Sequence, residues 1–502
     1  MTKMDKLKIK NGVLTAGGRP VTLRGFGLGG WLLPEGYMWL FYTKCDRPRR
    51  IEALIRELCG DAYAEGFWQK YYDRYITEED IRYISAHGFN SIRLPFNARH
   101  LEEPNYLKHI DDCVDWCEKH GVYAVLDMHA APGGQTGQNI DDSARDVPEL
   151  FTCVENQKKL AELWRALARR YAGREAVAGF DLLNEPILKK DSQHAHKLVP
   201  LYIQLTEIIR DEDPDRIVIW EGMHWATDFS VFDKMTTKDV PEGVMLQFHK
   251  YWSPPDRESL ECFFEAAKRL NVPLYCGESG ENNLEWYTTL FPMLDAHHIS
   301  WSFWSYKKMQ TPNSISVFPK PKRWKDLIRY LDGGQRPDDP VEIFDGFLDC
   351  LTHGSFHEEI IHALNRTAPV LIPCEAFSSV SSKHPRAPGV VFRMDEGAQL
   401  VYADGHVGEH DCRRYGGEPR PDSERMFLRL RPGESVSYVL NETDAVKIKL
   451  NCQGDGVLNI NGTIATLESF RDGLTLSTSG KISVTCLDGD IYLENLEVAP
   501  CV

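Results

Sequence analysis

Short apolar runs recur eight times in the first part of the chain, and a longer amphipathic segment separates each run from the next. Strands that are apolar at nearly every position are buried on both faces, as in a parallel sheet covered by helices. Eight such strands alternating with helices over about 300 residues are typical of a closed (β/α)8 barrel, whereas an open doubly wound sheet more often has about six. We therefore predict an α/β fold with a TIM barrel, whose strands lie within residues 21–27, 89–95, 123–130, 177–186, 216–222, 244–251, 272–280 and 299–307.

The segments between these runs carry a helical pattern. In residues 155–173 the apolar side chains recur at intervals of three and four, and Gly173 follows as a stop signal. A second helix is expected from Ile110 to Gly121 on the same grounds. Ahead of the first barrel strand, two alternating runs are split by Asn-Gly and Gly-Gly pairs, which predicts an N-terminal hairpin.

The pattern of apolar residues changes after about residue 372. Helical periodicity stops, and many short alternating runs appear, separated by Gly, Asp and Asn-Gly turns. A segment rich in Ser and Pro, CEAFSSVSSKHPRAPG at 374–389, lies at the change. So many short strands are typical of a β-sandwich, here of a jelly-roll-like kind. We predict two domains, a catalytic barrel with the hairpin over residues 1–372 and a sandwich over 373–502.

Charge and cysteine content limit the partners and the compartment. The formal net charge of −16 repels nucleic acid, so no nucleic-acid partner is expected. No run reaches the roughly 18 apolar residues of a membrane span, and the first residues lack the apolar core of a signal peptide. Thirteen cysteines without a disulfide spacing favour reduced thiols. We expect a cytoplasmic protein, with a secretion signal removed by trimming as the alternative.

Polar side chains at the ends of the apolar runs are the candidates for chemistry, because barrel active sites lie at the carboxyl ends of the strands. Glu185 and Glu278 close the fourth and seventh runs, on opposite sides of an eight-stranded ring, so we expect them to face each other across its mouth. Cleavage of a glycosidic bond requires two such carboxylates. For either glutamate alone, an ordinary ion pair at the rim is the alternative.

Six motifs, in order and in the expected strands, resemble glycoside hydrolase family 5 over about residues 10–365. They are IRLP with Arg93, LDMHAAPGGQTG with His129, LLNEP with Asn184 and Glu185, FHKY with His249 and Tyr251, GES with Glu278, and FWSY with Trp304. In that family the glutamate of Asn-Glu-Pro is the acid/base and the glutamate of strand seven is the nucleophile of a retaining mechanism. The resemblance thus implies that Glu185 is the acid/base and Glu278 the nucleophile.

The neighbours of the two glutamates have supporting roles under the same resemblance. A nucleophilic carboxylate must stay ionised, which Arg93 and the Tyr251 hydroxyl would favour. Glu185 must hold a proton, which an ionised partner about 5 Å away encourages. Asn184 would bond the sugar 2-hydroxyl. His129 and His249 would bond sugar hydroxyls or orient the glutamates, and Trp304 would form the floor of subsite −1; the peptide after this tryptophan is often cis in the family.

The stretch RGFGLGGWLLPE at residues 24–35 admits two interpretations. Gly25, Gly27 and Gly30 match G-x-G-x-x-G, but no helix start follows them, which argues against a dinucleotide-binding turn. The stretch resembles instead the exo-β-1,3-glucanase branch of the family, in which a glutamate four residues after the Trp holds the terminal glucose. That glutamate is Glu35 here. Two departures concern substrate choice: Ser279-Gly280 follows the nucleophile, where that branch has Trp-Ser, and residues 38–67 form an insert.

We therefore expect a retaining β-glycosidase that acts on β-glucosidic linkages from the non-reducing end, without cofactor or metal. Cys113 and Cys117, four residues apart on a helix, are interpreted as core packing, because no second ligand pair follows them. The alternatives are an endo-acting or glycolipid-cleaving member and a non-catalytic carbohydrate-binding barrel. Carbohydrate binding by the sandwich, the sugar, the aglycone and the oligomeric state stay open.

Overall fold

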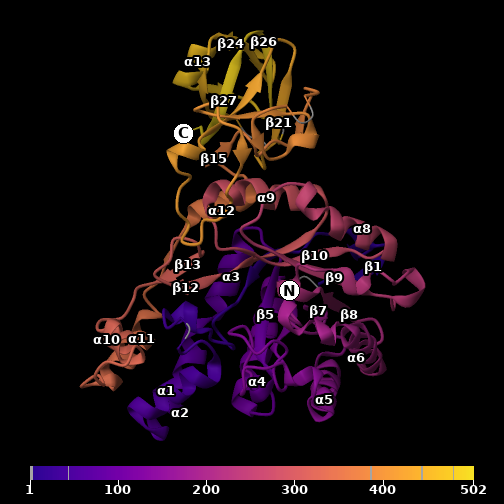
Figure 1. The fold of residues 1–502 in the computed structure, drawn as a ribbon, viewed down its shortest axis with the longest axis vertical. Helices are drawn as coiled ribbons and strands as arrows, with labels where there is room; N and C mark the ends of the chain where they lie inside the picture. Colours follow the sequence, from indigo (N-terminus) through magenta and orange to yellow (C-terminus); the bar gives the residue numbers. More distant parts are fainter. Residues whose placement is uncertain (1–3, 43, 385–386, 443–444, 479, 502) are drawn as a thin grey trace. The chain divides into compact units, whose positions relative to one another are not determined.

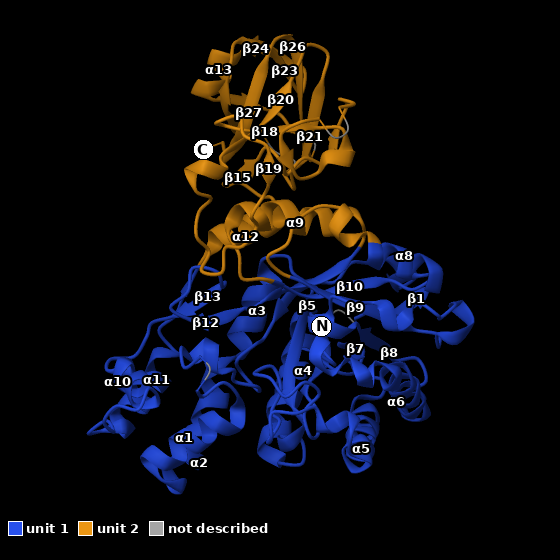
Figure 2. Ribbon diagram, viewed as in Figure 1, with its two compact units in different colours: residues 1–250, 262–279, 299–356 blue, residues 251–261, 280–298, 357–502 orange. Residues whose placement is uncertain are grey.

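The computed structural model describes residues 4–42, 44–384, 387–442, 445–478 and 480–501. The chain divides into two compact units that interleave along the sequence (Figure 2). Unit 1 comprises residues 1–250, 262–279 and 299–356, and unit 2 comprises residues 251–261, 280–298 and 357–502. Three stretches within the predicted barrel domain, 251–261, 280–298 and 357–372, thus belong by their contacts to unit 2, and a single boundary near residue 372 does not separate the two units.

Unit 1 contains a closed barrel of eight parallel strands that follow one another around the ring in chain order, from β4 to β11 (Figure 1). This confirms the predicted (β/α)8 barrel, and every strand overlaps one of the eight apolar runs. The strands are β4 Arg24–Gly27, β5 Ser91–Asn97, β6 Tyr123–Ala130, β7 Val177–Asp181, β8 Ile217–Glu221, β9 Val244–Lys250, β10 Leu274–Gly280 and β11 Ser300–Trp304.

Amphipathic helices separate the strands, and Figure 1 shows α4, α5 and α6 outside the barrel. In α5 the side chains that recur at three and four, from Leu160 to Tyr171, are the buried ones, as the pattern predicts. The helices of this layer in unit 1 are α3 Glu78–Ala86, α4 Pro104–His120, α5 Val154–Tyr171, α6 Leu198–Glu212 and α8 Glu261–Leu270, with a short α7 Met223–Ala226 after β8.

Three short strands close the other end of the barrel. Strands β1 Leu7–Lys10, β2 Val13–Ala16 and β3 Arg19–Pro20 form an antiparallel sheet with turns at Asn11-Gly12 and Gly17-Gly18. Leu7 and Leu14 pack in one apolar cluster with Tyr123 and Ile217, which begin barrel strands. The hairpin therefore covers the end where the strands start and leaves the carboxyl ends for a site.

The insert after β4 packs on a second insert from late in the unit. Helices α1 Pro48–Cys59 and α2 Asp61–Tyr75 contact α11 Pro340–Cys350, with α10 Trp324–Leu331 nearby. Trp39 is the centre of this aromatic core, with its ring centroid 4.5 Å from that of Phe347 and 6.1 Å from that of Trp324. A small sheet of β12 Lys307–Met309, β13 Ser316–Phe318 and β14 Ser355–Phe356 completes unit 1.

Unit 2 contains the predicted β-sandwich, in which two mainly antiparallel sheets share one apolar core. The first sheet consists of β15 Val370–Pro373, β18 Gln399–Tyr402, β20 Met426–Leu430, β22 Val446–Gln453, β25 Leu474–Leu476 and β27 Ile491–Pro500. The second consists of β16 Ser379–Val380, β21 Ser435–Val439, β23 Gly456–Ile460, β24 Thr463–Thr466 and β26 Lys481–Gly489. The short pair β17 Val390–Val391 and β19 Gly408–Glu409 and helix α13 Leu467–Asp472 lie outside these sheets.

Two helices of unit 2 pack beneath the sandwich. Helix α9 Leu284–Ala296 contacts both α12 Glu358–Asn365 and strand β15, although α9 lies between two barrel strands in the sequence. These contacts are the reason why residues 280–298 belong to unit 2. All thirteen cysteines are free thiols, with Cys113 and Cys117 fully buried in α4. Within the described part of the chain, every helix is too short or too polar to cross a bilayer.

Candidate active site

The predicted polar residues of unit 1 gather at the carboxyl ends of the barrel strands. Arg93 lies in β5, His129 in β6, His249 in β9 and Glu278 in β10, and Trp304 ends β11. All five side chains are buried. The prediction that Asn184 and Glu185 end their strand is wrong, since β7 stops at Asp181.

The backbone leaves the β conformation before Glu185. Leu182 N–H still donates to Ile219 O in β8, and Asn184 N–H donates to Met128 O in β6. Residues 182–184 are therefore still hydrogen-bonded to both neighbouring strands. Glu185 itself has a φ of +42°, in the left-handed region that residues with a Cβ seldom adopt. Its N–H donates to Glu221 Oε2 at 2.7 Å, which holds this unusual conformation. Strained backbone of this kind is concentrated at functional sites.

The two glutamates meet across the mouth of the barrel. One carboxylate oxygen of Glu185, one of Glu278 and one ring nitrogen of His249 all lie within 4.8 Å of one another. Glu185 and Glu278 are 4% and 5% exposed, so both residues are largely shielded from bulk water. A metal ion would also accept three atoms at this spacing, but both carboxylates already have donors in this chain, His249 for Glu185 and Arg93 for Glu278.

Arg93 organises the floor of the site. Its guanidinium is fully buried and donates to four side chains: Glu278 Oε1 at 2.5 Å, Asp181 Oδ2 at 2.8 Å, Asn184 Oδ1 at 2.8 Å and Glu221 Oε1 at 3.0 Å. Asp127 Oδ2 lies 3.1 Å from Nη2. Burial alone would lower the pKa of Arg93, but the surrounding carboxylates outweigh burial and raise it well above its usual range. The planar fork can satisfy several oxygens at fixed angles, which a lysine cannot do.

Three buried residues of this network were missed by the sequence analysis. Asp181 and Glu221 end strands β7 and β8, and Gln247 lies in β9, each with no exposed surface. Gln247 Nε2 donates to Asp181 Oδ2 at 2.9 Å and also bonds Glu221 Oε1. Burial raises the pKa of Asp181 well above its usual range, which favours its neutral form. The signal was present in the sequence, since Asp181 and Glu221 are acidic residues in or at the end of apolar runs.

His249 links the two glutamates. Its Nδ1 lies 2.7 Å from Glu185 Oε1 and 3.6 Å from Glu278 Oε2. Burial alone would lower the pKa of His249, but Glu278, Glu221 and the bond to Glu185 raise it well above its usual range. The pKa of Glu185 is also raised, mainly by burial, although His249 opposes that shift. The arrangement therefore favours a protonated imidazole beside a carboxyl group that can hold a proton.

His129 and Trp304 form a second pair. Their rings stack with centroids 5.5 Å apart and an interplanar angle of 4°. His129 Nδ1 lies 2.6 Å from Asp127 Oδ2, and its Nε2 lies 3.3 Å from Asn184 Nδ2. Burial lowers the pKa of His129, but the Asp127 carboxylate outweighs burial and raises it. The Trp304–Ser305 peptide is cis, as the resemblance implied.

The glycines of RGFGLGG make room for Trp304. A Cβ on Gly27 would lie 2.5 Å from Trp304 Cε3, and one on Gly29 would lie 2.7 Å from Cζ2 of the same ring. Gly30 has a φ of +82°, and a Cβ there would lie 2.6 Å from the Tyr75 hydroxyl. The short 3-10 helix that follows starts only at Gly36. Gly27 and Gly29 are thus explained by close packing against the Trp304 ring, and Gly25 by its contact with the Ser91 backbone. The phosphate-binding interpretation has no helix N-terminus to support it.

Two predicted residues remain, Glu35 and Tyr251. Glu35 is 2% exposed, and Asn139 Nδ2 donates to its Oε2 at 3.3 Å. Tyr251 follows the end of β9 and belongs to unit 2, with its ring centroid 5.4 Å from that of Trp252. The expected support of Glu278 by the Tyr251 hydroxyl stays a prediction.

A family model described as Cellulase (glycosyl hydrolase family 5) matches residues 59–310, which is half of the chain and includes strands β5 to β11. The chain belongs to glycosyl hydrolase family 5. It is therefore a glycoside hydrolase of β-glycosidic linkages, and the alternative of a non-catalytic binding barrel is not retained.

Curated relatives of this family 5 enzyme include glycosidases of several kinds. A β-xylosidase of Phanerodontia chrysosporium is 30% identical over 342 residues, which are 60% of this chain and 70% of the relative. Endoglucanase C of Acetivibrio thermocellus is 27% identical over 48% of this chain and 87% of its own length. The probable glucan 1,3-beta-glucosidase A of Aspergillus fumigatus is 27% identical over 46% of this chain and 55% of its own length.

Proposed function

We propose that this family 5 enzyme is a retaining, exo-acting β-glucosidase in which Glu278 is the nucleophile and Glu185 the acid/base. The observation that carries the mechanism is the approach of the two carboxylates within 4.8 Å. Retaining glycosidases hold their two carboxyl groups about 5–5.5 Å apart, and inverting enzymes hold them about 6.5–9.5 Å apart to admit a water. The short separation supports direct attack on the anomeric carbon.

In the first step a Glu278 oxygen attacks the anomeric carbon and forms a glycosyl ester. The bond from that carbon to the leaving oxygen breaks, and this oxygen takes the proton of Glu185. Arg93 Nη1, 2.5 Å from Glu278 Oε1, keeps the attacking carboxylate ionised and aligned. Asn184 has its Oδ1 bonded to Arg93, which leaves its amide nitrogen to donate to the sugar 2-hydroxyl.

In the second step Glu185, now a carboxylate, takes a proton from water while the water oxygen attacks the anomeric carbon. The ester bond to Glu278 breaks, and the sugar leaves with its original configuration. His249 Nδ1, 2.7 Å from Glu185 Oε1, stabilises the carboxylate that exists between the two steps. The bond from Glu185 N–H to Glu221 keeps the glutamate in place throughout.

Action at a chain end is supported by Glu35 and Asn139. Their side chains, a buried carboxylate and a half-buried amide, form a polar pair from the loops after β4 and β6. Such a pair matches the hydroxyls of a terminal sugar, whereas a groove for internal units would have to stay open along its length. An endo-acting enzyme is the second candidate, and the match to endoglucanase C favours it.

A panel of 4-nitrophenyl β-glycosides of glucose, galactose, xylose and mannose tests the sugar, and NMR of the first product tests its configuration. We expect the glucoside to be preferred and the first product to be the β-anomer. Product profiles from β-1,3-glucan and from a glucosylceramide separate the modes of action. Release of glucose alone from the glucan supports exo action, release of long fragments supports endo action, and an α-anomeric first product contradicts the retaining mechanism.

A further inference from the structure

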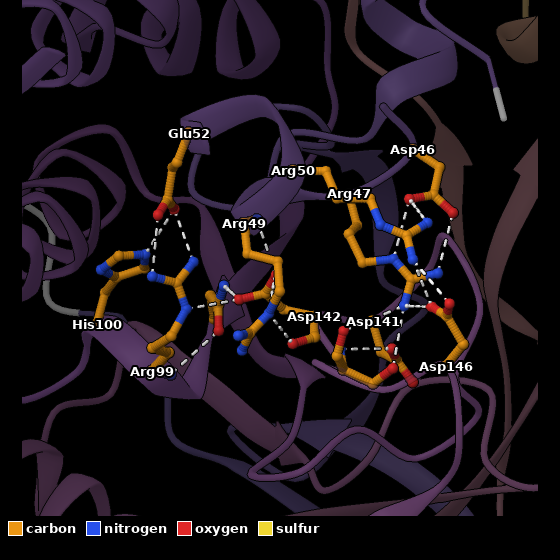
Figure 3. Close-up of polar contacts among 12 residues, drawn as sticks. Asp46, Arg47, Arg49, Arg50, Glu52, Arg99, His100, Asp141, Asp142 and Asp146 are labelled. Atoms are coloured by element: carbon orange, nitrogen blue, oxygen red, sulfur yellow. Dashed lines mark hydrogen bonds and ion pairs between the residues drawn. The ribbon is translucent and has the colours of Figure 1, made fainter. Parts of the chain in front are cut away.

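Arginine and carboxylate side chains join the three loops that follow β4, β5 and β6 (Figure 3). The first loop and the start of α1 supply Asp46, Arg47 and Arg49, and the β5 loop supplies Arg99. From the β6 loop come Asp141 and Asp142, which are at most 5% exposed. Asp142 accepts from Arg49 N–H at 2.9 Å and from Arg99 Nε at 2.6 Å. The loops therefore act as one connected body at this side of the barrel mouth.

Within the β6 loop, the turn from Gly137 to Ser143 carries Asn139 and is closed by one aspartate. Asp141 Oδ2 accepts from Gly137 N–H at 2.8 Å, and its Oδ1 accepts from Ser143 N–H at 2.9 Å. Gly137 has a φ of +74°, and a Cβ there would lie 2.4 Å from the backbone of Asp146. The two ends of the turn are thus fixed to each other by their N–H groups.

Arg47 fixes the same two ends by their carbonyl groups. Its Nη1 donates to Ser143 O at 3.2 Å and to Ser143 Oγ at 3.0 Å, and its Nη2 donates to Gly137 O at 3.5 Å. Arg47 is 2% exposed, and Asp46 Oδ2 lies 2.9 Å from its Nη2. A lysine, with a single ammonium group, cannot reach both ends of the turn together.

The residues next to Arg47 also fix Glu35. Gly36 N–H donates to Asp46 O at 2.8 Å, and a Cβ on Gly36 would lie 2.0 Å from Cys45 O, so the two segments touch directly. One short stretch, 45–47, therefore holds the backbone beside Glu35 and, through the Arg47 guanidinium, the turn that presents Asn139. The Glu35 to Asn139 bond of 3.3 Å lies between these two anchors.

We propose that Arg47 is a positioning residue that holds Asn139 against Glu35 and so shapes the subsite for the terminal sugar. The proposal rests on the proposed exo-glucosidase function, because the Glu35 and Asn139 pair matters to catalysis only if a sugar end binds there. Arg47 itself is enclosed by protein groups and acts on the substrate through Asn139.

A double-mutant cycle on 4-nitrophenyl β-D-glucoside tests this proposal. Arg47→Lys and Asn139→Ala should each raise KM about tenfold, the loss expected for one hydrogen bond to a charged group, with kcat changed less than about threefold. Arg47→Lys should add no further rise in the Asn139→Ala background, because its effect passes through Asn139. A merely structural role would lower Tm and add its effect in both backgrounds.

Arg50→Lys is the matched control. Arg50 pairs with Asp46 at 3.0 Å and with Asp146 at 2.7 Å, and none of its hydrogen bonds among the described residues reaches the 137–143 turn. We expect its KM to equal that of the parent. If Arg47→Lys is insoluble, Ser143→Ala removes one acceptor of Arg47 and should raise KM about threefold, again only when Asn139 is present.

Three outcomes would overturn the proposal in distinguishable ways. Equal KM effects of Arg47→Lys with and without Asn139 would show that Arg47 does not act through Asn139. A raised KM for Glu35→Gln and Asn139→Ala, with Arg47→Lys unchanged, would keep the sugar-end subsite and remove only the role of Arg47. Parental KM for both Glu35→Gln and Asn139→Ala would reject the proposed chain-end subsite and, with it, the proposal.

Discussion

His249 Nδ1 lies 2.7 Å from Glu185 Oε1, so the imidazole and the carboxyl group share one hydrogen bond in a buried site. Burial raises the pKa of Glu185, and His249 lowers it again without cancelling the shift. The pKa of His249 is raised well above its usual range by its carboxylate neighbours. The protonation of each group therefore depends on the other, and the pH dependence of the enzyme can report on both.

The alkaline limb of the pH profile should lie above the ordinary pKa of a glutamate, about 4.3. The acid/base must be protonated for the first step, and its protonated fraction falls only above its raised pKa. A plot of log kcat/KM against pH checks this. Glu185→Gln, assayed with a dinitrophenyl glucoside that needs no acid help, should lose the alkaline limb. Persistence of that limb at the same pH would assign it to another group.

Replacing His249 with glutamine should move the alkaline limb to higher pH. The protonated imidazole lowers the pKa of Glu185, so a neutral amide in its place lets that pKa rise further. The measurement is kcat/KM across the pH range for the variant and the parent. His109→Gln is the control, because His109 is a buried histidine of α4 outside the site. A shift to lower pH would contradict the assigned interaction.

Glu278→Ala and Glu185→Ala should each lower kcat on an unactivated β-glucoside by about 10³-fold or more. With a dinitrophenyl glucoside, Glu185→Ala should form the glycosyl ester and then stall, because no base activates water. Azide needs no base, so it should restore turnover and yield the β-glycosyl azide, which NMR identifies. Glu162→Ala on the exposed face of α5 should behave as the parent. Parental activity of both glutamate variants would end the proposed mechanism.

Gly29→Ala should lower both stability and kcat/KM. The new Cβ would lie 2.7 Å from the Trp304 ring, which cannot yield easily because it stacks on His129 and bonds Tyr37. Overpacking of this kind costs about 1–3 kcal/mol, which thermal unfolding measures. Gly66→Ala, in α2 with no atom within 4 Å of the new Cβ, should instead stabilise by about 0.5–1 kcal/mol. A Gly29 variant as stable and active as the parent would remove the proposed packing role.

The barrel could be predicted because each of its strands is visible as an apolar run in a short stretch of sequence. Each strand from β4 to β11 is buried on both faces, so its apolar run is visible without knowledge of its neighbours. Glu185 and Glu278 were found because each is a carboxylate at the end of an apolar run and also belongs to a family-like motif, LLNEP or GES, whereas Asp181 and Glu221 lie in apolar runs but outside these motifs. The exact strand end at Asp181 was missed, since nothing in the letters LLNEP marks where the left-handed turn begins.

The inner network was harder to predict because it depends on which side chains share the barrel interior. Asp181, Glu221 and Gln247 come from three different strands and meet only when the ring closes. The packing partners of the insert at 38–67 could not be predicted for a similar reason. Its aromatic core is completed by Phe347 and Trp324, which lie about three hundred residues later in the sequence, and no local pattern predicts these contacts.

The interleaving of the two units bears on how such enzymes can be recombined. Because α9 packs on β15 and α12, the piece of chain between barrel strands β10 and β11 must match the sandwich rather than its sequence neighbours. A chimera made with one crossover near residue 357 would inherit residues 280–298 from the wrong parent. To exchange unit 2 between two such enzymes, all three of its segments must come from the same parent. The same requirement limits the positions at which homologous genes can be recombined.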